Sequence, residues 1–572
     1  MAVLYCWYYS RNLMTTLRNI GNTRDLSQLD QDDILSYWPF GEFPPRESQE
    51  IIQEWVQTLS PDIRYIICEI PVGGGKSPLA LNLSGWFSRS FGDAYLLTPQ
   101  KILQKQYEES FDKYLLHTLY GKSNYTCESK ATNCDIGADI KPMCDSCPHR
   151  DAIQRMPKAP NVVLNYTLAL NLFKYVASDD GPVRPRKMVV FDEAHTLEHH
   201  LTEFNSIVFS EMRCKKLNVR FQIPKSIYEA MEWIRKIYMP ALTDKIMKLT
   251  PDIQRVLTEM EFEPGRRVSM DEQRAIKDLR ELKEHRQAIT EYLISKDIGE
   301  VDTRYVLVNE GKTSFKFKEL YGRHIFKELV EPMGDRFLFL SSTILDKDSY
   351  CSDLGIDPEK TAFISIPSEF PEDNRPVLYM PTINMKYGWN DDTPTQRAER
   401  KKMIARIVRL CNDMHPEDNG VIHAGSFQVA KWLVQELNGK ISHQIMHHNP
   451  ESGYTRDAVI NEFQVDDGIP KLLISPSVTE GLDLKDDKGR FAIFAKVPYP
   501  YLGDAWVKKR MSLSNTWYTI QALIAIIQGG GRVVRSPTDW GHVYILDSGW
   551  DNLYRRAKYM IPKWWKESYQ EV

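Results

Sequence analysis

Short apolar runs recur along this chain, and most of them end in a polar or glycine-containing turn that leads into a stretch with helical periodicity. The runs are 65–68, 94–99, 161–166, 188–191 and 337–340, followed by 419–426 and 471–475. Apolar strands that alternate with helices are typical of parallel sheets that are buried on both faces. The pattern therefore predicts an α/β fold.

Residues 200–300 follow a different pattern. Their apolar positions recur at helical spacing, at Ile227, Met231, Ile234, Ile276, Leu279, Leu282, Ile289 and Leu293. Pro224, Pro240 and Pro251 predict breaks between the helices. Residues 271–296 are amphipathic and rich in charge, which favours a solvated helical insertion. Residues 305–317 predict a β-hairpin around Asn309-Glu310-Gly311.

Length and composition limit the class of protein. A chain of 572 residues is too long for one core and predicts three or four domains, and 42% hydrophobic with 26% charged residues is the composition of a soluble globular protein. No apolar run is long enough for a membrane span, and the first residues lack the features of a signal peptide. The net charge of −4 means that binding to nucleic acid would need a local groove.

The stretch Glu69–Ser77, EIPVGGGKS, lies between a predicted strand and a predicted helix. Gly73, Gly74 and Gly75 would let backbone N–H groups approach phosphates, Lys76 would reach the β- and γ-phosphates, and the Ser77 hydroxyl would bind Mg²⁺. Ile70 stands where the usual pattern has its first glycine, so a simple glycine-rich turn is the alternative. Just upstream, Arg46 and Gln49 precede an amphipathic helix at 51–59 and are candidates to face a nucleotide.

An acidic pair, Asp192-Glu193, ends the apolar run 188–191 and begins the sequence Asp-Glu-Ala-His. Downstream of a phosphate loop, such a pair supplies what a nucleotide hydrolase needs. Asp192 would hold Mg²⁺, largely through water, and Glu193 would orient the attacking water. Thr98 and Gln100 follow another predicted strand, at the edge where open α/β sheets bind ligands.

Four of the nine cysteines are clustered, at Cys127, Cys134, Cys144 and Cys147. The segment between them is too polar to fold by burial, so it would need a metal. Four thiolates suit tetrahedral Zn²⁺ or a [4Fe–4S] cluster, and the spacing alone favours zinc. The scattered positions of the other five cysteines indicate a reducing, cytoplasmic compartment rather than a disulfide framework.

These motifs together resemble superfamily 2 helicases of the XPD/DinG family, which carry a four-cysteine Fe–S domain between the phosphate loop and the DEAH box. The resemblance extends over about residues 40–550 and favours [4Fe–4S] over zinc, although the cysteine spacing is short. Further matches are Asn165-Tyr166 (Asn-His in the family), Ser341-Ser342-Thr343 (S-A-T), 367–371 (the Ser-Pro-Phe linker), 479–484 with Gly481 and Asp483 (E-G-x-D), 496–500, and 528–535 (Q-x-x-G-R-x-x-R).

The resemblance implies two RecA-like motor domains with an inserted Fe–S domain and a helical arch domain. The implied boundaries are 1–112, 160–200 and 328–371 for the first motor, 113–159 for the Fe–S domain, 201–327 for the arch and 372–572 for the second motor. ATP would lie between the motors, with Gly481 and Asp483 near it. Gln528, Arg532 and Arg535 would act in catalysis, and the two arginines, three residues apart, are expected on one helix face.

The implied function is that of an ATP-dependent DNA helicase, a monomeric motor that moves 5′→3′ on single-stranded and forked DNA and has no membrane partner. Candidate groove residues are Tyr120, Lys122, Tyr125, Tyr499, Tyr501 and Trp506. Two alternatives are an RNA-directed ATPase of the same architecture and an ATP-switched binding protein with structural zinc. A fused nuclease is not expected, because too few residues remain for one.

Overall fold

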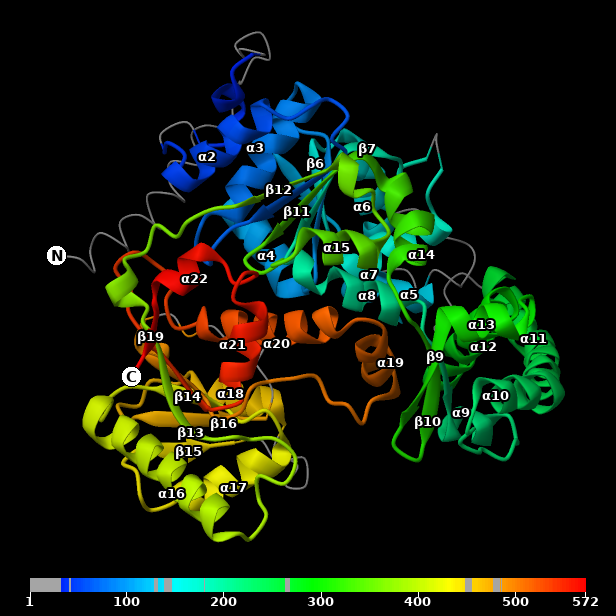
Figure 1. Cartoon of the computed structure of the whole chain (residues 1–572). Helices are drawn as coiled ribbons and strands as arrows, with labels where there is room; N and C mark the ends of the chain where they lie inside the picture. Colours follow the sequence, from blue (N-terminus) through cyan, green and yellow to red (C-terminus); the bar gives the residue numbers. More distant parts are fainter. Residues whose placement is uncertain are drawn as a thin grey trace.

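The computed structural model describes residues 32–40, 43–127, 132–137, 147–178, 181–262, 268–447, 455–476, 484 and 486–572. It contains two large parallel sheets and a third, largely helical part built around a small antiparallel sheet (Figure 1). In Figure 1 the first sheet lies at the top, the second at the lower left and the helical part at the right. The predicted α/β class with two parallel sheets is confirmed.

The first sheet has seven strands, and every neighbouring pair is parallel. Their spatial order is β12 (Thr361–Ser365), β1 (Tyr65–Glu69), β11 (Gly334–Ser341), β7 (Arg186–Asp192), β2 (Ala94–Thr98), β6 (Asn161–Asn165) and β3 (Leu116–Thr118). All five apolar runs predicted in this part of the chain are strands of this sheet. The edge strand β3 also belongs to it, although it lies within the segment 113–159 that was expected to form a separate domain.

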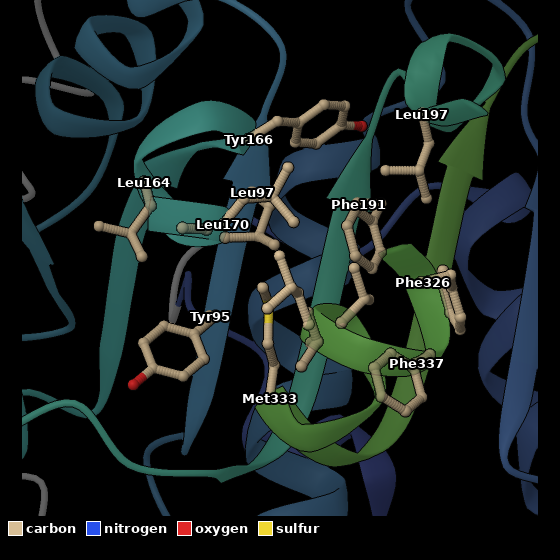
Figure 2. Packing of buried hydrophobic residues seen from close by; sticks show 14 of the residues in the cluster. Tyr95, Leu97, Leu164, Tyr166, Leu170, Phe191, Leu197, Phe326, Met333 and Phe337 are labelled. Atoms are coloured by element: carbon tan, nitrogen blue, oxygen red, sulfur yellow. The ribbon is translucent and has the colours of Figure 1, made fainter. Parts of the chain in front are cut away.

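Helices cover both faces of the first sheet because alternate strand residues point to opposite sides. One face packs against α2 (Glu47–Gln57), α3 (Lys76–Ser88) and α4 (Lys101–Ser110). The other packs against α6 (Pro148–Arg155), α7 (Tyr166–Tyr175), α8 (Leu197–Phe204), α14 (Arg323–Ile325) and α15 (Lys347–Leu354). Figure 2 shows this second face, where Leu97 and Phe191 of the strands pack beside Tyr166 and Leu170 of α7.

The second sheet repeats this arrangement. Its strands, all parallel, are β15 (Gln444–Met446), β16 (Lys471–Ser475), β14 (Gly420–His423), β17 (Phe491–Phe494), β18 (His542–Asp547), β13 (Val377–Ile383) and β19 (Tyr569–Glu571). On one face lie α16 (Pro394–Arg409) and α17 (Phe427–Leu437). On the other lie α18 (Arg456–Phe463), α20 (Asn515–Gly530), α21 (Trp550–Ala557) and α22 (Lys563–Glu567).

The third part, which we call the arch, lies between the first-sheet strands β7 and β11 in sequence. Its sheet has the antiparallel order β8 (Ile207–Ser210), β10 (Ser314–Glu319), β9 (Tyr305–Glu310), so the predicted hairpin is confirmed. Its helices are α9 (Glu211–Lys216), α10 (Ile227–Trp233), α11 (Met239–Phe262), α12 (Met270–Ile289) and α13 (Ile298–Arg304). Its core combines aliphatic side chains with a group of aromatic ones, in which Phe209 stacks on Phe315 at 5.0 Å.

The predicted helix breaks at Pro240 and Pro251 are both wrong. The helical run that starts with α10 continues through Pro240 without a gap, and α11 continues through Pro251 in its middle. Proline removes one backbone hydrogen bond and strains the preceding turn. Ile246 and Ile253 lie on either side of Pro251 and are both buried in the arch core. Their tertiary packing therefore holds the helix together through a residue that would end it in isolation.

The cysteine segment is described only in part. A short pair, β4 (Thr126–Cys127) with β5 (Thr132–Asn133), leads into the single turn α5 (Cys134–Gly137). Arg280 of α12 binds this turn, with 2.9 Å between its guanidinium and the Asp135 carboxylate and a second bond to the Asp135 carbonyl. The arch thus contacts the cysteine segment.

A buried ion cluster joins the three parts at α19 (Ala505–Leu513). The Arg510 guanidinium is only 1% exposed and lies 2.8 Å from both Glu198 of α8 and Asp353 of α15. It also lies over the rings of Tyr321 and Trp517, at 4.4 and 4.8 Å. Burial and the neighbouring Asp353 raise the pKa of Glu198 to about 8, against the opposing effect of Arg510.

The Trp506 indole, also on α19, donates a 2.7 Å hydrogen bond to the carbonyl of Glu319 at the base of the arch. Trp506 is therefore buried in this junction, and its predicted role as an exposed stacking platform for nucleic acid is wrong. No helix among the described residues is both long and apolar enough to cross a bilayer.

We predict that Arg510→Ala destabilises the protein strongly. It leaves the acidic side chains of Glu198 and Asp353 in a buried site without their cation, and removing one partner of a buried ion pair costs about 3–5 kcal/mol. The exposed Lys509→Ala, on the same helix, is the matched control and should have little effect. Melting temperatures of the two variants, followed by circular dichroism, check this; equal melting temperatures would contradict it.

Candidate nucleotide site

The phosphate-loop residues and the acidic pair predicted from the sequence lie where strands of the first sheet end. The phosphate loop follows β1, Asp192 ends β7, and Ser341 ends β11, the strand between those two. Carboxyl ends of parallel strands open onto the same edge of a sheet, which is where such folds bind ligands. The register therefore brings three separate sequence motifs to one place.

The phosphate loop depends on glycine at two positions. Gly73 and Gly75 have φ angles of +79° and +71°, in the left-handed region that side chains disfavour. A Cβ on Gly75 would lie 2.1 Å from the Gln49 amide nitrogen, which donates a 2.8 Å hydrogen bond to the Gly75 carbonyl. Arg46 binds the Gly73 carbonyl in the same way. The predicted pair Arg46 and Gln49 thus braces the loop through its backbone.

Lys76 and Glu193 form an ion pair, with 2.5 Å between Nζ and Oε1. Burial alone would lower the pKa of Lys76, but the carboxylates of Glu193 and Asp192 raise it above its ordinary value. Burial would raise the pKa of Glu193, but Lys76, His195 and Arg532 hold it well below its usual range. Lys76 is therefore a cation and Glu193 a carboxylate at neutral pH.

Asp192 behaves in the opposite way to its neighbour. Burial raises the pKa of its carboxyl, and the charge of Glu193 adds to that effect while Lys76 opposes it. Tyr107 of α4 lies near the same carboxylate. Burial is the main cause that raises the pKa of the Tyr107 phenol well above its usual range, and the negative charge of Asp192 adds to it. Tyr107 was not singled out in the sequence, since nothing local indicates its distant neighbour Asp192.

The turn after β11 contacts the second sheet directly. Gln528, near the end of α20, donates hydrogen bonds to the Ser342 and Thr343 hydroxyls at 3.0 and 2.7 Å. His195 lies 2.9 Å from the Ser341 hydroxyl and 3.5 Å from Glu193. His195 was not singled out in the sequence, although it ends the Asp-Glu-Ala-His motif. This network links the acidic pair to the other half of the protein.

Arg532 and Arg535 belong to a segment that lies against the phosphate loop, since a Cβ on Gly73 would lie 3.0 Å from the Arg535 carbonyl oxygen. The charge of Arg532 also helps to lower the pKa of Glu193. The expectation that both lie on one helix face is wrong, because α20 ends at Gly530 and the arginines follow in a turn. The run Gly529-Gly530-Gly531 ends the helix, as glycine disfavours helical backbone. A Cβ on Gly531 would lie 3.2 Å from Val72, so this run also lets α20 approach the phosphate loop closely.

Other predicted positions stand apart or lie outside the described residues. Gly481 and Asp483 of the E-G-x-D motif are outside them. Thr98 is fully buried and bonds the Gln100 carbonyl, which makes its role local. Asn165 caps α7 by accepting from the Leu168 N–H at 2.8 Å. Phe370, which sequence analysis placed in a linker, packs near Gly73, where a Cβ would lie 2.5 Å from its ring.

Three of the four clustered cysteines are described, and Cys144 is outside the described residues. Burial, and then the neighbouring Cys147 and Cys127, raise the pKa of the Cys134 thiol. No group of three His, Cys, Asp or Glu side chains arranged to hold a metal occurs among the residues described, which lack the fourth cysteine. A metal held by the four cysteines therefore stays a prediction from the sequence.

Of the aromatic groove candidates, Tyr501 is exposed, and Tyr499 stacks on Tyr518 with 5.0 Å between ring centroids. Tyr120 hydrogen-bonds Glu108 at 2.7 Å. Tyr125 is partly buried and packs edge-on against His149. Lys122 is exposed.

Comparison with known proteins identifies both halves of the chain. Residues 407–568 match the helicase C-terminal domain family, and residues 42–222 match the family of the type III restriction enzyme res subunit. In overall fold the chain is similar to a solved XPD helicase, with a TM-score of 0.59 at 15% identity, covering 93% of this chain and all of that one. It is also similar to Xpd4 of S. tokodaii, with a TM-score of 0.52 at 13% identity and coverage of 92% and 100%.

Among curated proteins, the chain is 31% identical over 94 residues to the regulator of telomere elongation helicase 1 homolog of Anopheles gambiae, and 29% identical over 105 residues to the Fanconi anemia group J protein homolog of Gallus gallus. These matches cover 14% and 16% of this chain, and 10% and 8% of the relatives. The matched part thus spans about a tenth of the length of these relatives. The chain thus contains a region similar to the helicase C-terminal domain family and a region similar to the type III restriction enzyme res subunit family, and its fold is that of the solved XPD helicases.

We predict that Gly75→Ala abolishes nucleotide binding, because its Cβ would meet the Gln49 amide that braces the loop. Gly311→Ala in the arch hairpin is the matched control, since Gly311 has a similar φ of +66° and nothing within 4 Å of an added Cβ. Each variant carries about 1 kcal/mol of backbone strain, and the control should bind normally. Titration with a fluorescent ATP analogue checks this; equal affinities would contradict it.

Proposed function

We propose that this protein is an ATP-dependent DNA helicase that moves 5′→3′ on single-stranded DNA and separates duplexes at forks. The observation that carries the proposal is the cleft itself. Lys76 and Glu193 come from the first sheet, while Gln528 makes hydrogen bonds to Ser342 and Thr343 from the second. A hydrolase site divided between two motor domains can convert the state of its nucleotide into opening and closing of the cleft.

The ion pair between Lys76 and Glu193 suggests how binding of ATP prepares the site. Lys76 would leave Glu193 for the β- and γ-phosphates, which carry more negative charge than one carboxylate. Glu193, ionised and released, would accept a hydrogen bond from the attacking water and orient it. Arg532 and Arg535 would then stabilise the negative charge that develops on the transferring phosphoryl group.

Ser77 and Asp192 would hold the Mg²⁺ ion, which neutralises phosphate charge when it is bound. Ser77 lies in the first turn of α3 and Asp192 ends β7, so both belong to rigid elements of the first sheet. Tyr107, facing Asp192 from α4, would keep that carboxylate oriented toward the ion.

DNA would cross the protein along a groove that reaches the cysteine segment. Exposed Tyr501 and Lys122 are the candidates that remain for stacking and phosphate contact, together with partly buried Tyr499. The contact between Arg280 and Asp135 joins the arch to the cysteine segment. A single strand could therefore be held between these parts during movement.

The experiment that tests this function is strand displacement with duplexes that carry a 5′ or a 3′ single-stranded tail. We predict ATP-dependent displacement of the 5′-tailed duplex, and ATP hydrolysis that single-stranded DNA stimulates. Glu193→Gln should bind ATP normally but lower turnover at least about 100-fold, because the amide cannot act as a base. Glu50→Gln, an exposed substitution on α2, is its matched control.

Each result of this test has a defined meaning. Displacement of only the 3′-tailed duplex would overturn the polarity. Stimulation by RNA but not by DNA would replace the substrate class. Hydrolysis that leaves every duplex intact would indicate an ATP-switched binding protein, and unchanged turnover in Glu193→Gln would remove Glu193 as the base.

For the cysteines, we propose that Cys127, Cys134, Cys144 and Cys147 hold one [4Fe–4S] cluster that orders their segment. Cys134→Ser should remove iron, sulfide and the visible absorbance of the anaerobically purified protein. Cys411 is buried in the core of the second sheet, so Cys411→Ser should keep the iron, the sulfide and the visible absorbance. Because Lys76 and Asp192 lie outside the segment, ATP binding should survive in Cys134→Ser. Stoichiometric zinc without iron in the wild-type protein would overturn the cluster assignment.

A further inference from the structure

Glu69, at the end of β1, is a buried carboxylate for which the catalytic scheme has no use. It is 2% exposed. One carboxylate oxygen, Oε1, accepts hydrogen bonds from the backbone N–H groups of Ile344 and Leu345 at 3.0 and 2.9 Å. The other, Oε2, accepts a 2.6 Å hydrogen bond from the Ser365 hydroxyl. The carboxylate therefore fixes two segments that lie almost three hundred residues further along the chain.

The first of these segments is a strained turn. Leu345 has a φ of +68°, a conformation that leucine rarely adopts and that costs about 1–2 kcal/mol. Two N–H groups that converge on a single oxygen explain why the turn persists. Leu345 then packs into the hydrophobic core of the second sheet, so the turn is a bridge across the cleft.

The same turn carries the polar contact across the cleft. Ser342 and Thr343, directly before the anchored residues, accept the hydrogen bonds from Gln528. On the other side, the backbone N–H of Ile70 donates a 2.7 Å hydrogen bond to the Ser341 carbonyl. Glu69 thus lies between the start of the phosphate loop and the residues that contact the second motor.

Glu69 is needed as a hydrogen-bond acceptor at the correct position, and its negative charge matters less. Burial raises the pKa of its carboxyl, while the three hydrogen-bond donors lower it, and no cation contributes to either effect. An amide oxygen in the same place could accept both backbone bonds, and the Ser365 hydroxyl could accept from the amide nitrogen. A carboxylate one methylene shorter could not reach the turn.

We propose that Glu69 is a positioning residue that couples the phosphate loop to the second motor by holding the 344–345 turn in place. This rests on the proposed ATP-driven motor function. Loss of the anchor would let the turn relax, which would displace Ser342 and Thr343 from Gln528 and withdraw Leu345 from the second core. Nucleotide would still bind to the phosphate loop, but closure of the cleft would no longer follow.

The test compares Glu69→Gln with Glu69→Asp in the full chain. The glutamine variant should keep wild-type turnover, because it restores every hydrogen bond. The aspartate variant should keep the KM for ATP within about twofold while DNA-stimulated kcat falls about 10- to 100-fold, the effect of a misplacement of about an ångström. Glu359→Asp, the same change at an exposed position, is the matched control.

Hydrogen exchange of the Ile344 and Leu345 amides gives a second readout, which should accelerate in Glu69→Asp and not in Glu69→Gln. Faster exchange with unchanged kcat would mean that the anchor is structural only, and would overturn the proposal. So would a Glu69→Gln variant as impaired as Glu69→Asp. If the wild-type protein does not hydrolyse ATP, the proposed function fails instead, and the coupling role fails with it; the exchange data then describe only a structural anchor.

Discussion

The ion pair between Lys76 and Glu193 is the interaction on which the site depends. Two charges withdrawn from water need each other, and here each belongs to a different motif, the phosphate loop and the strand end of β7. Their pairing keeps the lysine charged and the glutamate ionised through mutual attraction. The pair therefore holds both groups in the states that the proposed hydrolysis requires, and in that proposal the phosphates of the nucleotide replace Glu193 as the partner of Lys76.

The rest of the architecture places other groups around that pair. The parallel register of β1, β11 and β7 aligns three strand ends, and α20 brings Gln528 to the middle one. At its other end α20 lies beside the Arg510 cluster, where Trp517 donates to Glu198 at 3.3 Å. Glu198 follows Glu193 by five residues on the adjoining helix. One helix of the second motor thus contacts the first motor near the site and again at the arch.

Local patterns in the sequence were sufficient for the strands that the seven apolar runs form, for the phosphate loop and for the acidic pair, but not for the other strands of the two parallel sheets. The features that were predicted depend on neighbouring residues, such as Gly73 and Gly75 at positive φ or Asp192 at the end of an apolar strand. Features that depend on contacts between residues far apart in the sequence could not be predicted from it. The bonds from Glu69 to Ile344 and Leu345, the burial of Trp506 against Glu319 and the packing that carries α11 through Pro251 all depend on the folded chain. The helix α20 ends at Gly530 because three consecutive glycines disfavour helical backbone, so the three-residue spacing of Arg532 and Arg535 does not place them on one helix face.

The strand order of the first sheet has a consequence for the growing polypeptide. β1 is made first, yet both of its partners, β11 and β12, begin only at Gly334 and Thr361. At a synthesis rate of about 5–20 residues per second, the apolar strand Tyr65–Glu69 waits roughly 15–50 seconds for its first neighbour. Both of its edges stay open to other chains during that time. The arch and the cysteine segment, which are made in this interval, therefore lengthen the period in which a ribosome-bound chain needs a chaperone.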